Sequence, residues 1–266
     1  LQAAAMTFWL DCGAYADTCP YMSKAIAVDC SGPYYIPNLN CDSICAYTNH
    51  SFATSFRGFA HESYTFCLER TLDALARRLG MDPYELRLIN AIKPGQTTPT
   101  QVTATASNMG NMTACLQKLK TLINWGEGDR QQLGPHLVKA KGISGLWKTP
   151  NPPTNAAAGA LLTFNTDGSL NLNTGVIEMG SGSQTQLAQI LAERLKMSAH
   201  RINVKLDTDT FLSPYYWKTV ASMTCFLAGR AVLKAADDLI SQLKTQAALV
   251  FKCDADDLAV AQERVY

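Results

Sequence analysis

One stretch of the sequence restricts the fold more than any other: GVIEMGSGSQTQLAQILAERL, residues 175–195. Its apolar start predicts the end of a strand, and the apolar spacing that follows predicts an amphipathic helix over 183–196. Between them stand Gly180 and Gly182, which can adopt positive φ or let the backbone approach another group closely. Two interpretations stay open at this point: a plain strand-to-helix turn with a serine cap, and a loop that binds a ligand. The hydroxyl-bearing residues of the stretch are Ser181, Ser183 and Thr185.

The first half of the chain predicts strands followed by helices. Residues 1–55 are expected to form strands and loops, because β-formers alternate there with Gly, Pro and Asn. The clearest helix is expected over residues 61–80, with Gly80 at the position of a C-terminal cap. Another helix should begin after Asp82 as N-cap, with Pro83 in its first turn.

The second half predicts a different order of elements. Residues 91–111 are expected to be a surface connection, and a further helix should begin near Asn111 or Thr113. From residue 140 the pattern is βαβ-like, with a hairpin at FNTDGSLNLN, for which Asp-Gly favours a type I′ turn. Residues 222–251 predict one long helix or two in series. The fold class expected is therefore mixed α/β.

The polar stretch GEGDRQQLGPH marks the expected change of structural unit, because it is rich in Gly, Pro and charge. We expect a linker at 126–140 between a first part, 1–125, and a second part, 141–266.

Composition excludes some partners. Of 266 residues, 23 are basic and 22 acidic, which gives a formal net charge of +1. Such a chain has no long-range field to attract nucleic acid or an anionic membrane, so we expect neither partner. The longest apolar run, AAAGALLTF at 156–164, has the length of a strand and is too short to span a bilayer.

Nine cysteines are present, but they do not predict a disulfide framework, because the number is odd and no secretory pattern precedes them. Cys41 and Cys45 form a C-x-x-x-C spacing that does not suit the common zinc or iron–sulfur sites. The four histidines also lack the spacing of metal ligands. We therefore expect reduced thiols, a cytoplasmic location and no metal ligand among the side chains.

Two spans together resemble a known family. TSFRGFAHESYTFCLERTLDALARRLGMDPYELRLINAIKPG is similar to the molybdenum hydroxylase segment in which an Arg-Gly-Phe-Gly loop precedes a helix and an LGMDPxELRxxN motif. GVIEMGSGSQTQLAQILAERL, VKLDTDT and ASMTCFLAGRAVLKAA are similar, in that order, to the family's Met-Gly-Gln-Gly loop and helix, its DT strand and its next phosphate loop. The family includes xanthine dehydrogenase, aldehyde oxidase, carbon monoxide dehydrogenase and 4-hydroxybenzoyl-CoA reductase. The resemblance implies the molybdopterin-binding portion of such a catalytic subunit.

The resemblance also implies the site residues. The glycine loop would lie against the molybdopterin cofactor, with Ser181 where the family usually has Gln. A second loop would accept the phosphate end of the cofactor through backbone N–H groups at a helix start. The implied cofactor contacts are Phe56, Arg57, Gly180, Ser181, Gly182, Val220, Ala221 and Ser222, and Phe59 is the implied substrate contact. The family holds molybdenum without side-chain ligands.

Some residues depart from the family pattern. Ala60 stands where the family has Gly, and His61 and Glu62 replace a Pro-Gln-like pair. Tyr215, Tyr216 and Trp217 fill a stretch that is usually small and glycine-rich, where they would narrow the substrate funnel or simply pack.

The implied activity is hydroxylation of a heterocycle or an aldehyde with water as the oxygen source and a glutamate as general base. That glutamate is expected beyond Tyr266, and a GGFGG-type loop expected before the first strand is absent. Because the chain also begins at Leu1, we expect about the middle third of a catalytic subunit, inert and without cofactor by itself. One chain of a split enzyme and a degenerate, non-catalytic binding or assembly module are the alternatives. Iron–sulfur and flavin domains or subunits are the implied partners, and self-association is left open.

Overall fold

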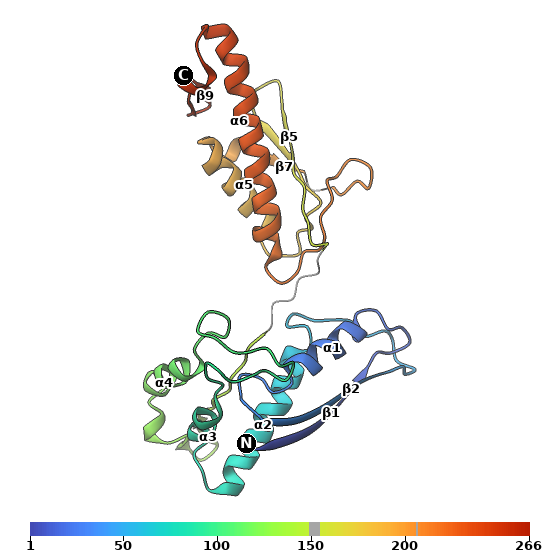
Figure 1. Ribbon diagram of the computed structural model, residues 1–266, viewed down its shortest axis with the longest axis vertical. Helices are drawn as coiled ribbons and strands as arrows, with labels where there is room; N and C mark the ends of the chain where they lie inside the picture. Colours follow the sequence, from blue (N-terminus) through green and yellow to red (C-terminus); the bar gives the residue numbers. More distant parts are fainter. Residues whose placement is uncertain (149–154, 206) are drawn as a thin grey trace. The chain divides into compact units, whose positions relative to one another are not determined.

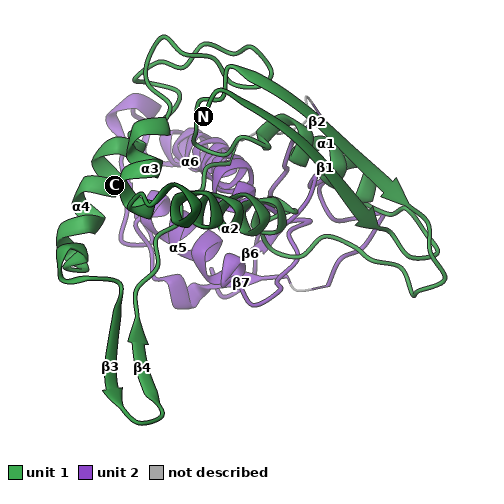
Figure 2. Ribbon diagram, turned by 90° about the horizontal axis from the view of Figure 1, so that it is seen from below, with its two compact units in different colours: residues 1–150 green, residues 151–266 purple. Residues whose placement is uncertain are grey.

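The computed structural model, shown in Figure 1, describes residues 1–148, 155–205 and 207–266. The chain divides into two compact units, residues 1–150 and 151–266, coloured separately in Figure 2. The expected linker, 126–140, belongs to the first unit, where β3 (Arg130–Gly134) and β4 (Leu137–Ala140) form an antiparallel hairpin. The Gly and Pro of that stretch thus make a hairpin turn, and the division between the units follows later in the chain.

The first unit combines two parallel strands with a group of helices. Strands β1 and β2 pair in parallel along their whole length. Side chains of β1 alternate: Met6, Phe8 and Leu10 pack against buried residues of the helices and the turn that precedes α2, whereas Trp9 is 70% exposed. This is the pattern of a sheet covered on one face. The elements besides the hairpin are β1 (Ala3–Asp11), α1 (Cys19–Asp29), β2 (Asn38–Ala46), α2 (His61–Leu79), α3 (Pro83–Asn90), α4 (Met112–Leu122) and the short turn η1 (Trp125–Glu127).

Helix α1 corrects the expectation of only strands and loops over residues 1–55. Pro20 lies in the first turn of this helix, where its missing N–H costs nothing, and it does not mark a loop. The buried face of α1 also contains polar residues, so the sequence does not show the apolar spacing by which a helix is usually predicted. Ser23, for example, donates to the carbonyl oxygen of Ser43 at 2.8 Å.

Helices α2 and α3 begin and end close to the expected residues. Gly80 has φ +62° and donates its N–H to the Arg77 carbonyl at 3.2 Å, as a left-handed C-cap does. The Asp82 carboxylate accepts from the Tyr84 N–H at 2.7 Å and so caps α3. Asn111 caps α4 in the same way, through the N–H of Ala114 at 2.9 Å.

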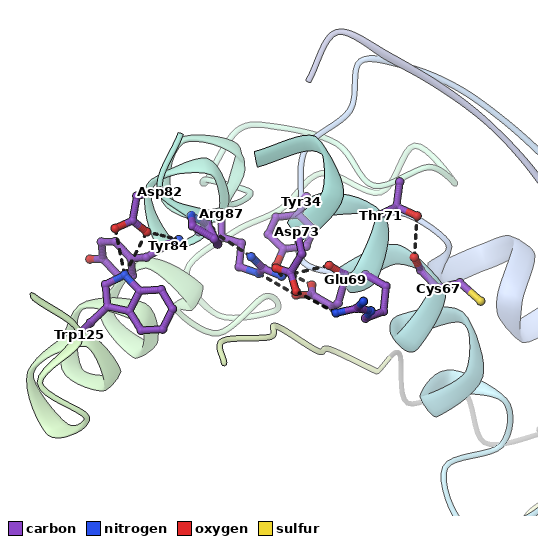
Figure 3. Close-up of polar contacts among 11 residues, drawn as sticks. Tyr34, Cys67, Glu69, Thr71, Asp73, Asp82, Tyr84, Arg87 and Trp125 are labelled. Atoms are coloured by element: carbon purple, nitrogen blue, oxygen red, sulfur yellow. Dashed lines mark hydrogen bonds and ion pairs between the residues drawn. The ribbon is translucent and has the colours of Figure 1, made fainter. Parts of the chain in front are cut away.

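The buried ion pair between Arg87 of α3 and Glu69 of α2 connects these two helices (Figure 3). The fully buried Arg87 donates to Glu69 at 2.7 Å and to Asp73 at 2.8 Å. Tyr34 donates its hydroxyl to the second oxygen of Glu69 at 2.6 Å. Burial, and then the Glu69 charge, raise the pKa of Tyr34, so this phenol stays protonated and keeps donating. The network thus gives the buried charges of Arg87 and Glu69 the partners that they need.

The second unit is a βαβ arrangement with an added strand. Strand β6 pairs antiparallel with β5 and parallel with β7, and α5 provides the crossover from β6 to β7. Helices α5 and α6 bury one face of this sheet around Leu172, Leu187, Leu191 and Val232. The elements are β5 (Leu161–Phe164), β6 (Leu170–Asn173), α5 (Ser183–Leu195), η2 (Ala199–Arg201), β7 (Ile202–Val204), the π-helical turn η3 (Thr224–Ala228), α6 (Gly229–Phe251), η4 (Ala255–Asp257), β8 (Val260–Ala261) and β9 (Arg264–Val265).

Two expectations in this unit are corrected in detail. Of the β5–β6 turn residues 166–168, only Gly168 has positive φ, +79°, so the turn is a three-residue type with a bulge and not type I′. The strand before the glycine loop ends at Asn173, short of residue 177. A Cβ on Gly175 would lie 2.6 Å from the Pro214 carbonyl oxygen, so the Pro214 segment packs closely against the chain just beyond the end of this strand.

All nine cysteines lie within the described residues and are free. In the three described ranges, no helix is both long and apolar enough to cross a membrane. Leu206, in the DT motif, lies outside the described residues.

Candidate functional site

The glycine loop of the second unit runs from the end of β6 to the first residue of α5. Gly180 and Gly182 have φ +95° and +70°, and a Cβ built on either would meet no atom of the described residues within 4 Å. Their backbone is therefore uncovered, as close approach of a ligand requires. No serine caps α5, because Gly182 holds the N-cap position without a side-chain bond.

Glu178 caps this loop instead, and sequence reasoning missed it. One oxygen of its carboxylate accepts from the N–H of Gly180 at 2.8 Å and of Gly182 at 3.0 Å, and from the Ser181 hydroxyl at 3.2 Å. The other oxygen accepts from the N–H of Gln184 at 3.3 Å. The signal available in the sequence was an acidic residue two positions before a Gly-Ser-Gly turn.

Those bonds determine the protonation of Glu178. Partial desolvation would raise the pKa of this carboxyl, but the amide bonds from Gly182, Gln184 and Gly180 outweigh it and lower the pKa to about 2. The carboxylate is thus an anion held inside the loop at any ordinary pH.

The second loop lies beside the first. The Ile177 N–H donates to the Thr219 hydroxyl at 3.2 Å, and Cys225 of η3 donates its thiol to the Gln186 side chain of α5. Ala221 and Ser222 have φ +52° and +58°, and the Met223 N–H closes a turn onto the Val220 carbonyl at 2.9 Å. Ser222 therefore precedes the helix and does not cap it. The structure brings Gly180–Gly182 and Val220–Ser222 to one end of the second unit.

The aromatic residues of the YYWK stretch have different surroundings. Tyr216 packs against the core of the second unit, and its hydroxyl lies 2.8 Å from that of Thr224. Tyr215 is 58% exposed. Packing thus accounts for Tyr216.

The first unit carries the other predicted residues, Phe56, Arg57 and Phe59. Phe56 and Arg57 are exposed, and within the described ranges the Arg57 side chain makes no hydrogen bond or ion pair. Phe59 and Ala60 have φ +60° and +65°, so the chain is left-handed just before α2. Gly58 has φ +115°, and a Cβ there would clash with the Glu62 carboxylate, at 2.1 Å.

His61, which sequence reasoning assigned to no role, holds this loop. Its Nε2 lies 2.8 Å from the Asp29 carboxylate, and its Nδ1 lies 2.9 Å from the Gly58 carbonyl and 3.1 Å from that of Phe59. The ring therefore joins the Asp29 carboxyl at the end of α1 to the two backbone carbonyls of the loop. Both side chains of this His–Asp pair are 5% exposed.

The chemistry available follows from these groups. The two loops of the second unit offer uncovered glycine backbone, hydroxyls and a left-handed turn before a helix. The first unit offers the Arg57 guanidinium, a multiple donor with no partner in the described ranges. The two loops of the second unit suit a large polar ligand with an anionic end, and the guanidinium of the first unit suits an anionic group. Across the part of the chain that is described, three or more His, Cys, Asp or Glu side chains nowhere gather as a metal-binding group.

Comparison with known proteins identifies the family and agrees with the fold. The molybdopterin cofactor-binding domain family matches residues 118–266, and a second family of the same description matches residues 1–91. The chain therefore belongs to the molybdopterin cofactor-binding domain family.

The similar proteins are named as xanthine dehydrogenases, aldehyde oxidases and a carbon monoxide dehydrogenase. The chain is 31% identical to a probable xanthine dehydrogenase component of Bacillus subtilis (strain 168), over 93% of this chain and 33% of that protein. It is 26% identical to aldehyde oxidase 1 of Bos taurus, over 92% and 18% respectively. The carbon monoxide dehydrogenase of Oligotropha carboxidovorans has the same fold, with a TM-score of 0.63 at 24% identity over 97% of this chain and 35% of that one. The chain thus spans about a third or less of the length of each of these relatives.

Proposed function

We propose that this chain is the cofactor-binding portion of a molybdenum-dependent oxidoreductase that hydroxylates a heterocycle or an aldehyde, with water as the oxygen source. The observation that supports it most is the uncovered, left-handed backbone of the two adjacent loops in the second unit. Bound there, the molybdenum cofactor supplies the two-electron oxidation of a substrate carbon.

The residues of this chain would hold and orient that cofactor. Gly180, Ser181 and Gly182 would contact its body, and Val220, Ala221 and Ser222 would contact its anionic end. In the first unit, Phe56 and the free guanidinium of Arg57 would contact the cofactor, and Phe59 would contact substrate.

The remainder of the catalytic machinery is proposed to lie outside these 266 residues. That remainder includes the general-base glutamate and the iron–sulfur and flavin partners of the reaction. Nine free thiols support a cytoplasmic location, because reducing compartments keep cysteines unpaired.

Metal and pterin analysis of the full protein tests the proposal. We expect about one molybdenum and one pterin for each copy of this chain. Arg57→Ala should reduce the retained cofactor at least about tenfold, because a hydrogen bond to a charged group contributes about 1.5–3 kcal/mol. Arg78→Ala, which removes an exposed arginine of α2 in the same unit, is the matched control and should leave the content unchanged.

The outcomes separate the alternatives. A full protein that contains neither molybdenum nor pterin would overturn the proposal and favour a non-catalytic module. A normal content in Arg57→Ala would remove Arg57 from the proposed contacts and leave the loops of the second unit as the binding element.

A further inference from the structure

The Glu178 carboxylate is an anion that the chain supplies to its own glycine loop. It accepts hydrogen bonds from three amides and one hydroxyl, all contributed by residues 180–184. Helix starts and turns with left-handed residues attract anions because several N–H groups converge there. In this loop a residue two positions upstream already occupies the place of the anion.

The glycine loop needs an acceptor that fixes its backbone conformation. Gly180 and Gly182 lose more conformational freedom on ordering than other residues would, and no described atom within 4 Å supports the place of either missing Cβ. Packing therefore does not hold these glycines in position. The hydrogen bonds to Glu178 bring the N–H groups of Gly180, Gly182 and Gln184 together around one carboxylate.

Ser181, the middle residue, is held from three sides. Its hydroxyl donates to Glu178 and lies 2.5 Å from the hydroxyl of Ser183. The Gln186 side chain donates to the Ser181 carbonyl at 3.3 Å. Without the Glu178 carboxylate, the Ser181 hydroxyl would lose one of its partners and the flanking amides would lose their common acceptor.

We propose that Glu178 is a positioning residue for the cofactor: its carboxylate sets the conformation in which Gly180, Ser181 and Gly182 meet the molybdopterin. The inference rests on the proposed function. It assigns Glu178 no contact with substrate or cofactor.

Amide hydrogen exchange and cofactor content, measured on the full protein, test this role together. Glu178→Ala removes both oxygens and should reduce the exchange protection of residues 180–184 at least tenfold and the molybdopterin content several-fold. Glu193→Ala is the matched control: it removes an exposed carboxylate from α5, the helix that follows the loop, and should change neither quantity.

Glu178→Gln provides the conservative rescue. The amide oxygen of Gln can take the place of the carboxylate oxygen that serves Gly180, Gly182 and Ser181, but its NH₂ group cannot accept from Gln184. Protection should therefore return at Gly180 and Gly182 and stay low at Gln184, and cofactor content should recover with the two glycines. A residue needed only for general stability would not give this split.

Each outcome decides one question. Unchanged protection in Glu178→Ala, or lost protection with normal cofactor content, would overturn the positioning role. Cofactor loss in both Glu178→Ala and Glu178→Gln, despite restored glycine protection in the latter, would also overturn it. A wild-type protein without molybdenum and pterin would overturn the proposed function instead, and the exchange data would identify that case by showing an ordered loop.

Discussion

Ordinary residues occupy left-handed backbone at the candidate loops, where glycine would be expected. Phe59 and Ala60 lie in this region before α2, and Ala221 and Ser222 lie in it before η3. Each such residue costs about 1–3 kcal/mol and persists only where its surroundings determine the conformation. Strain of this kind is found at ligand sites, and in this chain it also occurs at ordinary helix ends such as Lys196 and Lys252.

Acid titration of Glu178 gives a prediction at this scale. Its pKa falls from an ordinary 4.5 to about 2, so the carboxylate contributes to loop order fully above pH 4.5 and loses that contribution as the pH falls toward 2. We expect amide protection at Gly180 and Gly182 to persist at pH 4 and to disappear near pH 2. This protection is measured by amide hydrogen exchange, with the rates corrected for the intrinsic exchange rate at each pH. Loss of protection already at pH 4 would contradict the assigned bonds.

At the scale of elements, the pair His61–Asp29 joins the end of α1 to the start of α2 and to the loop of Arg57. A second pair, His50–Asp11, has the same 2.8 Å separation, but its side chains are 76% and 47% exposed. The two pairs therefore differ in burial and not in separation.

We expect the buried His61–Asp29 pair to contribute more to stability than the exposed His50–Asp11 pair. His61→Ala removes a buried hydrogen-bond partner of Asp29 and should lower the free energy of unfolding by about 1–3 kcal/mol. His50→Ala removes an exposed pair and should cost at most about 1 kcal/mol. Urea unfolding followed by tryptophan fluorescence measures both changes. Equal losses in the two variants would show that burial does not control the contribution of this pair.

At the scale of the whole molecule, each unit has its own hydrophobic core. The core of the second unit is built from β6, α5, β7, η3 and α6, and those of the first unit from residues before 150.

Leu191→Ala tests that arrangement, because Leu191 is fully buried in the core of the second unit. We expect a loss of about 2–5 kcal/mol, seen as faster hydrogen exchange in β6 and α5. Exchange in α2, within the first unit, should not change. The control is Leu249→Ala, at a residue of α6 that is 72% exposed. This variant should stay within about 0.5 kcal/mol of the wild type. Equal effects in both units would contradict separate cores.

The sequence by itself determined the elements that short-range rules control. The bounds of α2 and α3, the caps at Gly80 and Asp82, and the crossover that contains α5 follow from residues within a few positions of one another. The family could also be predicted from the sequence, because its motifs are short continuous segments that occur in the same order along this chain.

Only the tertiary structure decided the rest. Helix α1 was hidden because polar residues such as Ser23 face inward, toward a strand distant in sequence. Strand β6 stops at Asn173, and the Pro214 segment, distant in sequence, packs against Gly175 just beyond that end. His61 acquires its role from Asp29, 32 residues away, and Glu178 acquires its role from amides that converge only when the loop closes. Such contacts depend on where the folded backbone places groups in space, and local sequence preference does not encode that.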